Sequence, residues 1–181
     1  MGKSTAETIL RGWRIPTIDT DVLARELVEP GQPALREIQA RFGNSVLDES
    51  GRLKRNRLAE IVFQDEAARK DLESILHPRI RALWTAQILK FQNQNSRAVT
   101  VIIPLLFEIA AESEFDATIC LACSTQSQWA RLRVRGWTDT QIKQRIAAQW
   151  TIEKKIARAD FMIWNESSLE VTAEQLRRVV D

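Results

Sequence analysis

The stretch Met1-Gly2-Lys3-Ser4-Thr5 opens the chain, and Gly2, Lys3 and Ser4 match the last three positions of the phosphate-binding loop pattern G-x-x-x-x-G-K-[ST]. In that loop, backbone N–H groups surround the phosphates of a nucleotide, the lysine reaches the β- and γ-phosphates, and the hydroxyl binds Mg²⁺. A short G-K-S-T stretch also occurs by chance, and it equally fits an ordinary helix start with Ser4 or Thr5 as the N-cap. The rest of the chain decides between these two interpretations.

The composition is typical of a globular protein with one sizeable core. The 181 residues are 44% hydrophobic and 28% charged, with 26 basic and 24 acidic side chains and a net charge of +2. This near balance indicates neither a nucleic-acid nor a membrane partner, and it does not predict an oligomeric state. Lys3 and Glu7 interrupt the first apolar stretch, and no run reaches the roughly 20 apolar residues that span a bilayer. We therefore expect no signal peptide and a cytoplasmic location.

Two cysteines, Cys120 and Cys123, form a C-x-x-C pattern at the end of an apolar stretch. A redox pair is one interpretation, but the sequence has no second cysteine pair and no nearby histidine to complete a zinc site. In an extended chain the two side chains would point to opposite faces of a sheet. The pattern therefore favours packing over redox or metal chemistry.

Strand-like and helical stretches alternate along the chain, which is typical of an α/β fold with a parallel sheet. Apolar runs predict strands at 15–18, 98–103, 116–121 and 161–164. Helical patterns cover 5–11, 21–28, 33–42, 55–63, 65–75, 79–92, 126–135, 138–150, 151–158 and 168–180. We expect Gly12 to be a helix C-cap, and we expect a helix break at His77-Pro78 because residues before proline avoid the α region. The stretch 22–95 has no clear strand and is predicted to be a helical insertion beside the sheet.

Polar residues follow the predicted strands. Asp19 and Asp21 come after the first strand, Pro104 ends the second, and Asn165 follows the last. In open α/β sheets, ligands bind beyond the carboxyl ends of the strands. The positions of these residues therefore predict one shared ligand site.

These residues could supply the groups that phosphoryl transfer requires, which are phosphate clamps, a divalent cation and a carboxylate that receives a proton. Lys3 is the candidate phosphate clamp, Ser4 the candidate Mg²⁺ ligand, and Asp21 the candidate base, with Asp19 nearby. The candidate cations for stabilising developing charge are Arg131, Arg135 and Arg145.

Each of these candidates also has a structural alternative. Asp21 could be an N-cap or a first-turn acid that interacts with the helix dipole. The arginines could form a solvated helix face. His77 is the only histidine, and a lone histidine beside a helix break is more often structural than catalytic.

Several stretches resemble, in the same order along the chain, the motifs of the dephospho-coenzyme A kinases. Residues 18–25, Ile-Asp-Thr-Asp-Val-Leu-Ala-Arg, are similar to that family's D-x-D-x-x-A-R segment, and residues 28–31 are similar to its V-x-P-G. Further matches are Gly-Arg-Leu-Lys-Arg (51–55), Ile-Val-Phe (61–63), Leu-Glu-Ser-Ile-Leu-His-Pro (72–78), Ile-Pro-Leu-Leu-Phe-Glu (103–108), residues 128–131, Arg135, Arg-Ile-Ala-Ala-Gln (145–149) and Ala-Asp-Phe-Met-Ile-Trp-Asn (159–165). Any one motif is modest, but so many in register are specific.

The resemblance implies a fold, an organisation and an activity. The fold is the three-layer α/β fold of P-loop kinases, with a five-stranded parallel sheet. A single domain would span 1–181, with a helical acceptor-binding insertion over 22–95 and an arginine-bearing lid over about 126–158. The activity is the phosphorylation of the ribose 3′-hydroxyl of dephospho-coenzyme A, with ATP and Mg²⁺, as the last step of coenzyme A synthesis.

Site residues follow from the same resemblance, position by position. Lys3 resembles the loop lysine, Asp21 the acid that orients or deprotonates the ribose hydroxyl, and Arg145 the lid arginine that reaches phosphates. The implied nucleotide contacts are Gly2, Lys3, Ser4, Thr5, Arg131 and Asn165. The implied acceptor contacts are Asp19, Asp21, Arg25, His77, Pro78, Leu105 and Leu106. Trp164 stands where an acidic residue is common in the family.

The resemblance also places a central strand and the first half of the loop upstream of Met1. Each buried backbone group left unpaired costs about 1–3 kcal/mol, which is large against a total stability of about 5–15 kcal/mol. We therefore expect the natural protein to begin upstream and to be an active kinase. The alternatives are an inactive homologue that acts as a nucleotide- or coenzyme A-binding module, a kinase with a rearranged loop, and another small-molecule P-loop kinase such as a sugar or shikimate kinase.

Overall fold

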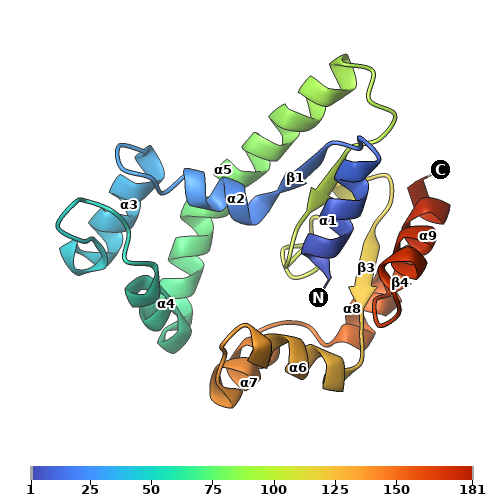
Figure 1. Cartoon of the computed structure of the whole chain (residues 1–181). Helices are drawn as coiled ribbons and strands as arrows, with labels where there is room; N and C mark the ends of the chain where they lie inside the picture. Colours follow the sequence, from blue (N-terminus) through green and yellow to red (C-terminus); the bar gives the residue numbers. More distant parts are fainter. Residues whose placement is uncertain (1, 181) are drawn as a thin grey trace. The chain divides into compact units, whose positions relative to one another are not determined.

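The computed structural model describes residues 2–180, which form two compact units (Figure 1). One unit combines the residues before Ile18 with those after Val101, and the other is Ile18–Val101. The elements are α1 (Lys3–Gly12), β1 (Thr17–Asp19), α2 (Thr20–Glu26), α3 (Pro33–Phe42), η1 (Asn44–Val46), α4 (Arg55–Gln64), α5 (Glu66–Asn93), β2 (Thr100–Ile102), η2 (Glu112–Glu114), β3 (Ile119–Ala122), α6 (Thr125–Val134), α7 (Asp139–Ala147), α8 (Ile152–Arg158), β4 (Phe161–Trp164) and α9 (Leu169–Val180). None of the helices in the described part of the chain is long and apolar enough to cross a membrane.

The first helix begins earlier than the sequence predicts. Its N-cap is Gly2, in the left-handed conformation at φ 80°, and not Ser4 or Thr5, which lie inside α1. Gly12 is still helical, so its prediction as the C-cap is also wrong. The chain leaves the helix through Trp13 and Arg14, and Arg14 carries the positive φ of 61°.

The unit Ile18–Val101 is a helical body built around one apolar cluster. Val28, Leu35, Ile38, Val46 and Leu58 form its buried centre, and apolar residues of α5 pack against them. Proline in the first turn of α3 suits the helix start, because the missing N–H has no partner there in any case. Apart from an isolated bridge between Leu47 and Leu53, no strand lies within α2 to α5, as the sequence predicted.

The predicted helix break at His77-Pro78 is wrong, because α5 continues through both residues. Pro78 has no N–H and so removes one bond of the helix ladder. Arg79 ties this part of α5 to its surroundings, since its Nη1 donates to the Ile75 carbonyl at 2.5 Å and its Nη2 lies 2.6 Å from Oε1 of Glu37 on α3. Packing of α5 on the helical core and this link to α3 outweigh the local preference of proline.

In the other unit, α1 and α9 pack together and α9 packs on β4. Their apolar faces meet at Ala6, Ile163 and Leu176, with Ile119 and Leu121 of β3 against them. β3 and β4 are parallel and in register from Ile119–Phe161 to Ala122–Trp164. This short sheet carries the loops that follow Ala122 and Trp164.

The described strands form two separate two-stranded sheets, β1–β2 and β3–β4. The five-stranded sheet implied by the resemblance is not formed by these residues. No other described strand pairs with the outer edges of either sheet.

A carboxylate fixes the start of the β3–β4 pair. Asp160 Oδ2 accepts hydrogen bonds from the Thr118 hydroxyl (2.7 Å) and the Thr118 N–H (2.8 Å). These bonds hold the pKa of Asp160 below its ordinary value. The resulting stability is present at neutral pH and is lost as the pH falls through that lowered pKa.

We predict that Asp160→Asn lowers the melting temperature by a few degrees at neutral pH. The difference from the wild type narrows as the pH drops below the ordinary carboxyl pKa of about 4 and on through the lowered pKa of Asp160. Thermal melts from pH 3 to pH 7 measure this. Asp116→Asn, an exposed neighbour, is the control and should match the wild type. A difference in melting temperature that stays constant with pH would contradict an electrostatic origin of this stability.

Candidate active site

The N-terminus of α1 lies against the end of β4. A Cβ atom added to Gly2 would stand 1.6 Å from Nδ2 and 2.8 Å from Cγ of Asn165, so only glycine fits at this distance. Gly2 also has φ 80°, which disfavours other residues. The backbone at the start of α1 is therefore held directly beside the first residue after β4.

Asn165 joins three elements of this unit. Its side chain faces Gly2, and its N–H donates to the Ala122 carbonyl at the end of β3 at 2.7 Å. Its carbonyl accepts a hydrogen bond from Arg131 Nη2 of α6 at 2.7 Å. Only 5% of Asn165 is exposed, so these contacts are largely shielded from water. The structure thus brings three predicted nucleotide contacts, Gly2, Arg131 and Asn165, to one place.

A second bond ties the same loop to α6. Glu166 Oε1 accepts from the Ser124 N–H at 2.9 Å and from the Ser124 hydroxyl. The Ser124 hydroxyl bond, followed by one from Ser127, lowers the pKa of Glu166. Ser124 is also the N-cap of α6, since its Oγ accepts from the Ser127 N–H. A serine just before a helix signals such a cap, but nothing in the sequence pointed to Glu166 as its partner.

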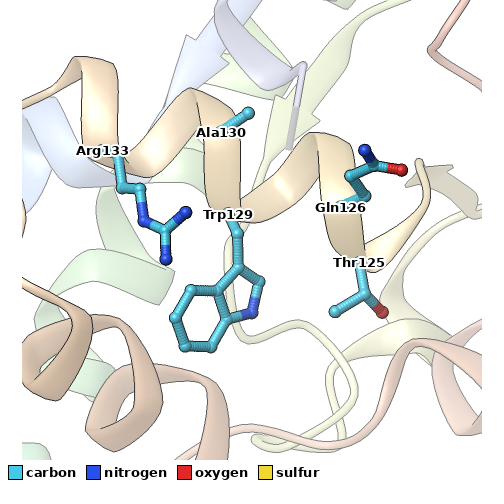
Figure 2. Close-up of a pocket in the computed structure, with 5 residues that line it drawn as sticks. All are labelled: Thr125, Gln126, Trp129, Ala130 and Arg133. Carbon is cyan, nitrogen blue, oxygen red and sulfur yellow. The ribbon is translucent and has the colours of Figure 1, made fainter.

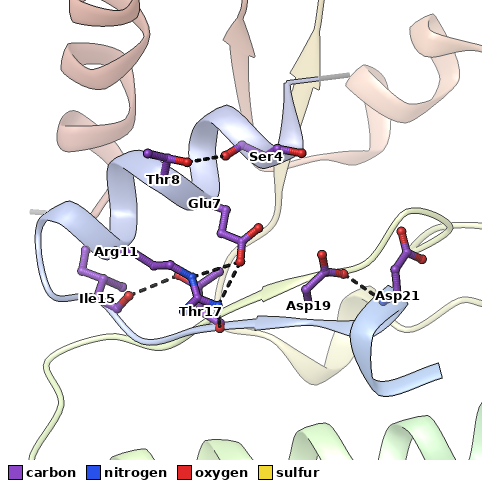
Figure 3. A network of polar contacts seen from close by, with 8 residues as sticks. All are labelled: Ser4, Glu7, Thr8, Arg11, Ile15, Thr17, Asp19 and Asp21. Atoms are coloured by element: carbon purple, nitrogen blue, oxygen red, sulfur yellow. Dashed lines mark hydrogen bonds and ion pairs between the residues drawn. The ribbon is translucent and has the colours of Figure 1, made fainter. Parts of the chain in front are cut away.

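The residues after Gly2 form the first turn of α1. Lys3 and Thr5 are half-buried and Ser4 is exposed. The Ser4 carbonyl accepts a hydrogen bond from the Thr8 hydroxyl at 3.0 Å, a side-chain bond one turn along the same helix (Figure 3). The N–H groups of a helix start and the positive end of its dipole attract anions, so this turn can bind phosphate.

Asp19 and Asp21 divide two roles at the start of α2. Asp19 is the N-cap, and its Oδ1 accepts the Asp21 N–H at 2.8 Å (Figure 3). Asp21 is exposed in the first turn, where the helix dipole favours a negative charge. The capping alternative therefore applies to Asp19, while Asp21 is a first-turn acid.

The other predicted acceptor contacts lie on different elements. Arg25 is exposed in the last turn of α2. On α5, His77 is half-buried and Pro78 is exposed. Leu105 and Leu106 are half-buried in the turn after β2, where their carbonyls accept the N–H groups of Ile109 and Ala111.

Arg145 and Arg135 lie on or beside the helices of the 126–158 region and are exposed. The Arg145 guanidinium stands 4.2 Å from the Trp137 ring centroid, close enough for a cation–π contact. Arg135 is the C-cap of α6. Arg131 contacts another predicted site residue, because its Nη2 donates to the Asn165 carbonyl.

A hollow runs along α6, lined by Thr125, Gln126, Trp129, Ala130 and Arg133 (Figure 2). The Arg133 guanidinium lies 5.4 Å from the Trp129 ring centroid, and its Nε and Nη2 pair with the Asp139 carboxylate at 2.9 and 3.0 Å. The pairing with Asp139 neutralises Arg133, the charged residue among those that line the hollow, so we assign the hollow no part in phosphate binding.

Both cysteines are buried free thiols. Burial raises the pKa of Cys120 and of Cys123, the latter against an opposing effect of Arg131. The thiols are therefore protonated at neutral pH and poorly reactive, which supports packing as their role. Within residues 2–180, no cluster of three or more His, Cys, Asp or Glu residues could hold a metal ion by itself.

The candidate site residues are divided between the two compact units. Gly2, Lys3, Ser4, Thr5, Leu105, Leu106, Arg131, Arg145 and Asn165 lie in one, and Asp19, Asp21, Arg25, His77 and Pro78 lie in the other. A helix that starts with Gly-Lys-Ser at the carboxyl end of a parallel strand is typical of one protein class. That class is the P-loop kinases with an α/β fold.

Comparisons with known proteins identify the family within that class. The family model of dephospho-CoA kinase matches residues 1–170. The dephospho-CoA kinase of Gloeobacter violaceus is 38% identical over 181 residues, covering 99% of this chain and 86% of the relative. That of Shouchella clausii is 40% identical over 176 residues, covering 97% and 89%.

Solved structures agree in fold. The crystal structure of TT1252 from Thermus thermophilus has a TM-score of 0.86 and 32% identity, covering 99% of this chain and 90% of that one. A dephospho-CoA kinase from Campylobacter jejuni has a TM-score of 0.71 and 29% identity with the same coverage. The chain belongs to the dephospho-CoA kinase family.

We predict that Gly2→Ala destabilises the protein by at least about 1 kcal/mol, because alanine is strained at positive φ and its Cβ meets Asn165. Urea unfolding measures this. Gly12→Ala is the matched control on the same helix, since a Cβ there meets nothing within 4 Å. It should be neutral or stabilising by up to about 1 kcal/mol.

The double variant Gly2→Ala/Asn165→Ala separates the two causes. Removing the Asn165 side chain relieves the clash but not the strained φ, so Gly2→Ala should cost less in the Asn165→Ala background. An equal cost in both backgrounds would contradict the close contact between the two residues.

Proposed function

We propose that this chain transfers the γ-phosphoryl group of ATP to the ribose 3′-hydroxyl of dephospho-coenzyme A, giving coenzyme A and ADP. The observation that carries the proposal is the arrangement of Gly2, Asn165 and Arg131 at the start of α1, in a chain whose family is dephospho-CoA kinase. The motifs of the acceptor side, Asp19, Asp21 and Arg25 above all, occur in the same chain.

On the nucleotide side, the first turn of α1 binds the phosphates. The N–H groups of this turn and the Lys3 ammonium neutralise the β- and γ-phosphates, and Thr5 completes the turn. Ser4 is exposed and offers the hard oxygen that Mg²⁺ prefers, so its hydroxyl would hold the ion together with phosphate oxygens and water. Bound Mg²⁺ neutralises charge on the phosphates. Arg131 and Asn165, which are hydrogen-bonded to each other at the end of β4, help to form the nucleotide site.

On the acceptor side, Asp21 orients the ribose hydroxyl and receives its proton. A bond forms between the 3′-oxygen and the γ-phosphorus, the bond from that phosphorus to the bridging oxygen breaks, and ADP leaves with the electron pair. Arg145 stabilises the charge that develops on the transferred group. Asp19, Arg25, His77, Pro78, Leu105 and Leu106 bind the acceptor.

The organisation of the chain follows from these roles. Residues 22–95 act as the acceptor-binding insertion, and residues of about 126–158 act as a lid that carries Arg145 within a single kinase domain. We infer a cytoplasmic protein, because buried free thiols such as Cys120 and Cys123 are typical of a reducing compartment.

Product analysis tests the substrate. The chain is incubated with Mg-ATP and one acceptor per reaction, which is dephospho-coenzyme A, shikimate or one sugar of a panel. Each product is identified by mass spectrometry and by the position of the new phosphate. We expect phosphorylation of dephospho-coenzyme A at the 3′-hydroxyl. A phosphorylated sugar or shikimate, or ligand binding without any product, would contradict the proposal.

We predict that Asp21→Asn lowers kcat by about 10²–10⁴-fold with little change in either KM, because the amide cannot accept the hydroxyl proton. Glu26→Gln, an exposed acid at the other end of α2, serves as the control and should keep wild-type turnover. Steady-state kinetics measure both variants. Turnover within a few-fold of the wild type in Asp21→Asn would exclude Asp21 as the base.

We predict that Arg145→Ala lowers kcat by about 10²–10³-fold, the usual effect of removing a group that stabilises charge in the transition state. The affinity for ATP measured by titration should change far less, because the contact strengthens only during transfer. Lys143→Ala, an exposed lysine on the same helix, is the matched control. An unchanged rate in Arg145→Ala would assign Arg145 to the solvated face of α7.

A further inference from the structure

A buried ion pair links the turn after β2 to the junction between α7 and α8. Glu108 Oε1 lies 2.8 Å from Lys155 Nζ of α8 and accepts the backbone N–H of Trp150 at 2.9 Å. The two charged side chains are 15% and 13% exposed. Lys155 Nζ also donates to Gln149 Oε1 at 3.3 Å, so two consecutive residues between α7 and α8, Gln149 and Trp150, are held.

The Trp150 ring strengthens the same link. It stacks on the buried ring of Phe107, with centroids 6.4 Å apart and planes at 12°. The Lys154 ammonium also lies over the Trp150 ring, 3.7 Å from the ring centroid. Consecutive residues, Phe107 and Glu108, therefore hold Trp150 by its ring and by its backbone.

The link joins two segments that carry proposed site residues. Leu105 and Leu106 directly precede Phe107 in the turn after β2. Arg145 lies on α7, five residues before Trp150. All of these residues belong to the same compact unit. The end of α7 is therefore anchored to the turn that bears two acceptor-side leucines.

Stability alone is a poor explanation for a buried pair of this kind. Taking two charges out of water costs free energy that their attraction barely offsets, and apolar replacements are often as stable. Among the described residues Glu108 Oε2 is also buried without a hydrogen-bond partner, which adds to that cost. What the carboxylate provides is direction, because a single oxygen fixes both an ammonium and one backbone N–H.

We propose that Glu108 is a positioning residue for phosphoryl transfer, which sets the place of Arg145 by fixing the α7–α8 junction to the turn after β2. The inference rests on the role proposed above for Arg145. Misplacing a catalytic group by about 1 Å can cost about 10²-fold in rate, so loosening this junction lowers turnover while substrates still bind.

The first experiment compares Glu108→Ala with Glu112→Gln. Glu112 pairs with Arg158 and so spans η2 and α8, but this pair does not reach Trp150. We expect Glu108→Ala to lower kcat by about tenfold or more with both KM values within about twofold, and Glu112→Gln to keep the wild-type kcat. Equal losses in the two variants, or a loss confined to KM, would overturn the proposal.

Lys155 variants keep the test valid if Glu108→Ala does not fold. Lys155→Arg retains the charge and should keep kcat within about twofold, whereas Lys155→Met should lower it as Glu108→Ala does. Wild-type turnover in a folded Lys155→Met protein would overturn the inference.

The Arg145→Ala background separates this inference from the proposed function. If Glu108 acts through Arg145, Glu108→Ala lowers kcat by less than about twofold in that background. The same fold-loss in both backgrounds would overturn the positioning role and leave the kinase function untouched. The absence of product from the wild type would instead contradict the proposed function.

Hydrogen exchange gives a readout that needs no turnover. We expect Glu108→Ala to speed amide exchange at Trp150 and along α7, and to leave β3 unchanged, while Glu112→Gln leaves both unchanged. Unchanged exchange at Trp150 would overturn the inference even in an inactive protein.

Discussion

The contact between the Gly2 backbone and the Asn165 side chain is the constraint on which the nucleotide side of this molecule depends. It leaves no room for a Cβ, and it sets the start of α1 at the carboxyl end of β4. The N–H groups of the first turn are then presented at the edge of the β3–β4 sheet, where α/β proteins bind ligands. Arg131 and Glu166 extend the same contact to α6, through the Asn165 carbonyl and through Ser124. Asn165 therefore links the start of α1, the end of β3 and Arg131 of α6.

Rigid links of the same kind recur elsewhere in this unit. Asp160 fixes the entry of β3 and β4 through Thr118, and Glu108 fixes the α7–α8 junction through Trp150 and Lys155. Phosphoryl transfer needs little covalent chemistry from the protein and depends on placing phosphates, cations and a base. In such a protein we expect some carboxylates to hold segments in place and others to take part in chemistry. Asp160, Glu166 and Glu108 hold segments in place here.

Much of the fold could be predicted from local patterns, and the contacts between segments could not. The alternation of strands and helices, the strand Phe161–Trp164 and the helix Pro33–Phe42 follow from apolar periodicity and from proline and glycine at helix ends. Ordered motifs indicated the family, which the comparisons confirm. The predicted helix break at Pro78 was wrong, because packing and the Arg79 links outweigh the local preference of proline.

Gly2 was predicted as a phosphate contact, but its fit to Asn165, 163 residues away, has no local signal. The pairing of Glu108 with Lys155 has no local signal either, since each is one charged residue among many.

We expect the first turn of α1, with Lys3 in it, to support phosphoryl transfer to dephospho-coenzyme A. ADP release with Mg-ATP, measured with and without dephospho-coenzyme A, tests it most directly when the wild type is compared with Lys3→Ala. We predict ADP release that depends on the acceptor in the wild type and is lost in a folded Lys3→Ala protein. Release that ignores the acceptor, or that survives unchanged in Lys3→Ala, would contradict it.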